Sequence, residues 1–189
     1  MEPFEYVIVL ISIILGLGIA QLLNGIADML AQFKKTKFSV AHSIFVVVLF
    51  FVFFQDWWYT FQYSREIEQW SQFIVLALVS FPIALFMLAR FMFPTGSRSQ
   101  ETDMYAYFSE NWRWLYAIFA STILISIVQN ITISGYTFTE QIPLMLYFTW
   151  YVVFISLNIQ NQKYHNAFQI AQLLLWIYFF AGVDNGMLN

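Results

Sequence analysis

Cysteine is absent from this chain of 189 residues, and charged residues make up only 10% of it. Without cysteine the protein has no disulfide, no Cys-ligated metal cluster and no thiol chemistry. Soluble domains carry about 25% charged residues, so a chain with so few could not cover its surface in water. The net charge of −3 is small and no basic stripe follows the sequence, which excludes nucleic acid as an expected partner.

Signature motifs of enzymes are also missing. The sequence has no G-x-S-x-G, H-E-x-x-H or P-loop motif, and no paired aspartates in a protease context. Its two histidines, His42 and His165, have no clustered third ligand, so we expect neither a metal nor a haem. We therefore expect no cofactor and no enzymatic activity.

Apolar residues are abundant, at 60% of the chain with 22 Phe. A membrane span needs roughly 20 mainly apolar residues, and stretches without alternation that lie in lipid must be helical. The segments that qualify are residues 4–30, 40–61, 73–93, 112–133, 143–159 and 164–183. The sequence predicts an all-α polytopic membrane protein, a single domain over residues 1–189 with about six antiparallel helices in the lipid bilayer.

Local signals refine these spans. Ser109 is a plausible N-cap for the fourth span, and Pro82 predicts a kink in the third. Residues 94–111 form the longest predicted loop, with a short interfacial helix in its second half. The chain begins with acidic residues and shows no cleavage site after the first apolar run, so we expect that run to be retained as a span.

Lysine and arginine indicate the orientation, because basic loops stay in the cytoplasm. All but Arg65 of the eight fall in or beside loops one, three and five. These residues are Lys34, Lys35, Lys37, Arg90, Arg98, Arg113 and Lys163. We expect a bacterial inner-membrane protein with these loops in the cytoplasm and both termini in the periplasm.

The first span carries polar residues that are costly in lipid. Gln21, Asn24 and Asp28 share one helical face at i, i+3 and i+7. The face either lines a pore or cavity or packs on another helix through its amides. Glycines next to this face permit close helix packing. They are Gly16, Gly18 and Gly25.

The sixth span carries a second polar face, with Gln169 and Gln172 following His165. Counting along the helices places Gln172 near the depth of Gln21, and Gln169 near that of Asn24. The two faces are predicted either to form a shared vestibule open to the cytoplasm or to close on each other as an amide ladder. The expected rim residues are His42, Arg90, Asn158 and His165.

On the outer side, Gln55 and Asp56 end the second span beside Trp and Tyr residues that anchor it at the interface. Asp56 is expected to be hydrated, to pair with Arg65 or to line an outer mouth.

Together these features favour a homo-oligomeric membrane protein that forms or gates a pore. The alternatives are a small transporter or ligand-binding membrane protein, and a non-catalytic subunit or anchor for a membrane or cytoplasmic partner protein.

Overall fold

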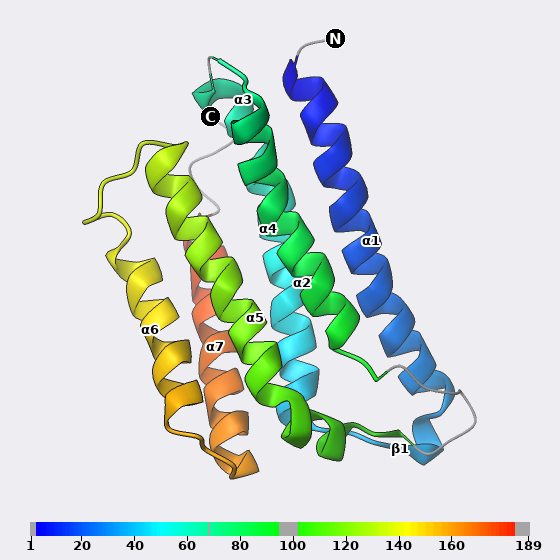
Figure 1. The fold of residues 1–189 in the computed structure, drawn as a ribbon. Coiled ribbons are helices and arrows are strands. Elements are labelled where there is room, and N and C mark those ends of the chain that lie inside the picture. The colour runs from blue at the N-terminus through cyan, green and yellow to red at the C-terminus, as the bar shows by residue number, and fades with distance from the viewer. Residues whose placement is uncertain (1–2, 68, 95–101, 184–189) are drawn as a thin grey trace.

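The computed structural model describes residues 3–67, 69–94 and 102–183 as a bundle of helices (Figure 1). Six long helices form most of this part of the chain. They are α1 (Pro3–Ala31), α2 (Val40–Thr60), α4 (Gln72–Phe91), α5 (Met104–Thr132), α6 (Ile142–Ser156) and α7 (Gln162–Val183). The short elements are η1 (Phe33–Lys35), β1 (Thr36–Lys37), α3 (Tyr63–Glu66) and β2 (Thr102–Asp103). The predicted all-α membrane bundle is confirmed.

Four helices, α1, α2, α4 and α5, are long and apolar enough to cross a membrane. The apolar α6 has 15 residues, which is about 22 Å of helix against a hydrocarbon core of about 30 Å. It ends at Ser156, earlier than the predicted limit of residue 159, and Asn158 then turns the chain with a φ of 49°. The chain is a multi-pass membrane protein, and six complete crossings remain a prediction.

The start of α5 corrects the prediction for residues 94–111. Ser109 is not an N-cap, because the helix begins at Met104 and is capped by Asp103, whose side chain accepts a hydrogen bond from Ala106 N. The expected interfacial helix is therefore the first part of α5. Met104 and Phe108 are fully buried and pack inside the bundle instead of facing the headgroups. Residues 95–101 of this loop lie outside the described part.

Packing places α2 between α1 and α7. α1 packs against α4 and α2, while α7 packs against α2, and α5 contacts α4 on one side and α6 on the other (Figure 1). The core between these helices is filled by large rings such as Phe45, Phe53 and Phe119. α4 continues through Pro82, and Gln129 of α5 donates a hydrogen bond to Ala77 O near the carbonyl that the proline leaves without its usual N–H.

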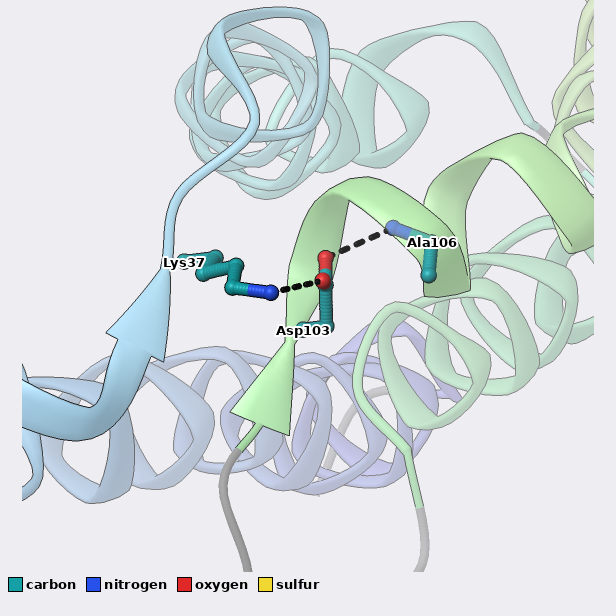
Figure 2. A network of polar contacts seen from close by, with 3 residues as sticks. All are labelled: Lys37, Asp103 and Ala106. Atoms are coloured by element: carbon teal, nitrogen blue, oxygen red, sulfur yellow. Dashed lines mark hydrogen bonds and ion pairs between the residues drawn. The ribbon is translucent and has the colours of Figure 1, made fainter.

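A small clasp joins the α1–α2 connection to the start of α5. Thr36 and Lys37 pair in parallel with Thr102 and Asp103. The Lys37 Nζ atom lies 3.1 Å from Asp103 Oδ2, and Asp103 Oδ1 accepts a hydrogen bond from Ala106 N (Figure 2). The hydrogen bond from Ala106 N, and then the nearby Lys37 ammonium, lower the pKa of Asp103. One carboxylate thus caps α5 and holds the clasp.

The connections α1–α2, α4–α5 and α6–α7 lie at one end of the bundle, which we call the basic end (Figure 1). The described cations other than Arg65 lie at or near it. They are Lys34, Lys35, Lys37, Arg90, Arg113 and Lys163. Because successive long helices run in opposite directions (Figure 1), every second connection lies at the same end of the bundle.

Candidate functional site

The polar face of α7 lies inside the bundle. His165, Gln169 and Gln172 are at most 1% exposed, so none of them faces lipid or an open surface. Their partners come from α5 and α6, and the residues form two linked groups along α7. We call them together the α5–α7 polar network.

The first group joins His165, Tyr116 and Gln169. The Nε2 atom of His165 lies 2.8 Å from Ile159 O, so it carries the proton and donates to that carbonyl. The Nδ1 atom is then an acceptor, and the hydroxyl of Tyr116 donates to it over 3.4 Å. Gln169 Nε2 donates to the same hydroxyl oxygen over 3.0 Å. The hydrogen bonds thus all run in one direction, from Gln169 to the backbone of the α6–α7 turn.

The second group surrounds Gln172. Its Oε1 atom accepts a hydrogen bond from Tyr151 OH, and its Nε2 atom donates to Tyr147 OH over 2.8 Å. Trp176 Nε1 also donates to Tyr147 OH, over 3.2 Å. Gln172 therefore holds two tyrosines of α6 against α7, which is the role that amides play between membrane helices.

Aromatic rings enclose the network and keep it from water. Phe168 stacks on Tyr116 with ring centroids 5.3 Å apart, and Trp112 contacts the His165 ring at 4.7 Å. Phe154 closes the side towards α6. Within the described residues one polar atom of the network has no hydrogen-bond partner, Gln169 Oε1. The arrangement holds helices together and offers a single free acceptor.

Sequence reasoning missed Tyr116, Tyr147, Tyr151 and Trp176. Tyr147 and Tyr151 are four residues apart, so they share a face of α6, and that spacing was the available signal. Aromatic residues are so frequent in this chain, at 21%, that the spacing does not stand out.

The polar residues of α1 lie elsewhere. Gln21 is half-buried, and Asn24 and Asp28 are exposed on the side of α1 away from the core. Because α1 and α7 pack on α2 and not principally on each other, the vestibule predicted between Gln21, Asn24, Asp28, Gln169 and Gln172 is not formed within one chain. Matching depth on two helices does not determine their order around a bundle.

The register of α1 on α4 also sets the depth of this face. Gly18 lies beside the backbone of Phe86, and Gly25 beside the ring of Phe93. The two helices run in the same direction (Figure 1). Asn24 therefore lies nearer the basic end than Arg90.

The three glycines differ in their surroundings. A Cβ atom on Gly18 would lie 2.4 Å from the ring of Phe53, and one on Gly25 would lie 2.2 Å from Phe93. These two positions need glycine for close packing. A Cβ atom on Gly16 would meet nothing within 4 Å, so Gly16 has no packing role inside the chain.

The predicted rim residues separate into buried and exposed sets. His42 is 1% exposed, and its Nε2 atom lies 2.7 Å from Met92 O. Nearby, Asn166 Oδ1 accepts a hydrogen bond from Ala41 N and joins α7 to the start of α2. Arg90 and Asn158 are exposed. His42 and His165 both contact the ring of Phe108.

On the outer half of α2, Gln55 and Asp56 are half-buried. Asp56 Oδ2 is buried without a hydrogen-bond partner in the described structure, and the expected pair with Arg65 does not form there. Within the described residues, no three His, Cys, Asp or Glu side chains cluster closely enough to hold a metal ion.

Comparison of this chain with protein-family models, curated proteins and solved structures returned no match.

Proposed function

We propose that this protein is a non-catalytic membrane protein that assembles with copies of itself along the outer face of α1, and that the assembly forms a polar pathway. The observation that carries the proposal is the composition of that face. Gly16, Ala20, Ala27 and Ala31 are all exposed there, at spacings of four, seven and four residues.

Small residues at such spacings let two membrane helices approach closely. No side chain of the same chain fills the space beside Gly16. The exposed positions in the second half of α7 differ, because they carry large apolar side chains that suit lipid. Examples are Leu174, Leu175 and Ile177.

The polar residues support the same face. Asn24 and Asp28 are exposed next to the small-residue stripe, close to the basic end. Polar groups at this depth are favourable when they face water or another protein. In an assembly along α1 they would surround the cytoplasmic mouth of the pathway.

The absence of native cysteine allows a direct test. Ala20→Cys and Ala27→Cys are introduced separately, the protein is oxidised in its native membrane, and dimers are measured on a non-reducing gel. A disulfide needs Cα atoms about 4.4–6.8 Å apart. Two α1 helices packed closely along this face would bring equivalent residues to such distances, so we expect a dimer from at least one position. Leu174→Cys on α7 is the matched control, and equal cross-linking there would indicate random collision and contradict the proposal.

The pathway itself is tested by flux through reconstituted vesicles. Wild-type protein should pass small ions, and Asn24→Leu should slow that flux while leaving the Ala20→Cys cross-link intact. If the wild type passes no ions although Ala20→Cys cross-links, the assembly stands and the pathway is rejected.

A second candidate, an internal binding site, is favoured by one observation. Gln169 Oε1 is a fully buried acceptor without a partner, where a ligand N–H or O–H group would bind. A crystal structure that resolves ordered water tests it. Density for an organic molecule on this atom supports a ligand site, while a single water or a rotated amide contradicts it.

A further inference from the structure

The basic end of the bundle carries an excess of cations. In the described residues six Lys and Arg side chains lie there against three carboxylates, Asp28, Asp103 and Glu110. Asp103 is already paired with Lys37. Lys34, Lys35, Arg90, Arg113 and Lys163 are exposed, and no ion pair involves them within the described structure.

Each group of exposed cations is adjacent to an exposed aromatic ring. Phe33 precedes Lys34, Phe91 follows Arg90, Trp114 follows Arg113, and Tyr164 follows Lys163. Among these, the Trp and Tyr side chains settle at the membrane–water interface. The cations beside them are therefore held at the level of the lipid headgroups and not out in the solvent.

Two of these cations, Arg113 of α5 and Lys163 of α7, lie near the contact between the rings of Trp112 and His165. The guanidinium of Arg113 lies 5.6 Å from the ring of Trp112, and that ring contacts His165 of α7. Lys163 lies two residues before His165, at the start of the same helix. Arg113 and Lys163 thus flank the junction of α5 and α7 at the basic end.

We propose that the basic end binds the phosphate headgroups of anionic phospholipids. Lys34 and Lys35 form one contact area, and Arg113 and Lys163 form another at the α5–α7 junction. Cations at this level attract anionic lipids over a distance set by ionic strength. The lipids supply the negative charge that the protein itself lacks at this end, and they fix the depth of the helices.

The test measures which lipids the protein retains. Protein is reconstituted in vesicles with equal amounts of phosphatidylglycerol and phosphatidylcholine, extracted in mild detergent and purified, and the ratio of the two retained lipids is measured. We expect phosphatidylglycerol to be enriched over phosphatidylcholine in the wild type. Each cation removed should weaken the preference about fivefold, and each variant removes two. The variants are Lys34→Gln with Lys35→Gln, and Arg113→Gln with Lys163→Gln.

Arg65→Gln removes an exposed cation at the opposite end and should leave the ratio unchanged. High salt should lower the enrichment of the wild type, which gives a measurement that needs no variant. A retained ratio equal to that of the vesicles would overturn the proposal. Loss of phosphatidylglycerol when inorganic phosphate replaces chloride at the same ionic strength would also overturn it, because the surface would then bind free phosphate.

Discussion

At the scale of single residues, Gln172 has the clearest role in the described chain. Its amide uses both ends, accepting from Tyr151 and donating to Tyr147, and its side chain is fully buried. A leucine of similar size would remove both bonds, so Tyr151 OH would lose this acceptor in an apolar site, while Tyr147 OH would keep the hydrogen bond from Trp176 Nε1. Buried groups that lose their partner cost more than the bond itself contributes.

We expect Gln172→Leu to lower the free energy of unfolding by about 1–3 kcal/mol. Unfolding of the purified protein by denaturant in mixed micelles measures the change. Gln21→Leu is the matched control, because Gln21 is half-buried and makes no hydrogen bond through its side chain within the described structure. A change as large for Gln21→Leu would show that the loss comes from the substitution of an amide in general and not from the network.

Asp103 is a second residue with two roles. Its pKa is lowered chiefly by the hydrogen bond from Ala106 N and then by Lys37. A carboxyl whose pKa is lowered in the folded protein stabilises the folded state at pH values above the ordinary pKa of that carboxyl, near 3.8. That stabilisation is lost as the pH falls through the folded-state pKa.

We expect Asp103→Asn to remove the part of the acid-linked stability that comes from this carboxyl, while Asn still caps α5. Asp103→Ala should destabilise the protein further at neutral pH, because it removes the cap as well. The midpoint of denaturant unfolding is measured against pH for all three proteins. Glu140→Gln is the control for a carboxyl outside the clasp. Hydrogen bonds from Thr137 also lower the pKa of Glu140, which lies at the far end of the bundle. If the profile of Asp103→Asn coincides with that of the wild type, the clasp does not contribute to acid stability.

At the scale of helices, the glycines of α1 separate packing inside the chain from packing outside it. Gly18 faces the fully buried ring of Phe53, and that ring has little room to move. Gly16 faces outward. The sequence shows three glycines on one helix but does not show which side each one faces.

We expect Gly18→Ala to destabilise the protein by about 1–3 kcal/mol, because the added methyl overpacks the contact with Phe53. Gly16→Ala should be neutral or slightly stabilising in the monomer, since alanine favours helix. Both are measured by unfolding in detergent at a protein concentration where the wild type is monomeric. Equal losses for the two variants would contradict the packing shown by α1 on α2 and α4.

The sequence predicted where the helices lie along the chain, but it did not predict which helices are neighbours in the bundle. Long apolar runs determine where spans lie, because lipid leaves the backbone no alternative to internal hydrogen bonds. Gln169 and Gln172 were correctly singled out as unusual in a span, yet their partners proved to be Tyr116, Tyr147 and Tyr151 instead of the amides of α1. Neighbours around a bundle are selected by the fit of many side chains, which one sequence does not reveal. The start of α5 was misplaced for a similar reason, since Asp103 and Ser109 are both adequate caps and burial of Met104 and Phe108 decides between them.

At the scale of the whole molecule, the charge difference between the two ends predicts how the protein lies in its membrane. The basic end should face the cytoplasm. Gln160→Cys places a thiol in the exposed α6–α7 connection at that end, and Phe138→Cys places one in the exposed α5–α6 connection at the other.

We expect a membrane-impermeant maleimide to label Phe138→Cys in intact cells, and Gln160→Cys only after the membrane is opened. Neither substitution removes a cation, so the orientation signal is preserved. Labelling of Gln160→Cys in intact cells would reverse the orientation, and labelling of both would contradict an odd number of crossings between them.

The position of α7 has a consequence for biosynthesis. α7 leaves the ribosome after α2, α5 and α6, yet it contacts α2 through Phe180 and satisfies the tyrosines of α5 and α6. Until α7 packs against them, the hydroxyls of Tyr116, Tyr147 and Tyr151 have no partner from α7. A chain released before α7 is complete would therefore display polar groups within the bilayer, and such groups give a membrane protease a means of recognising an unfinished product.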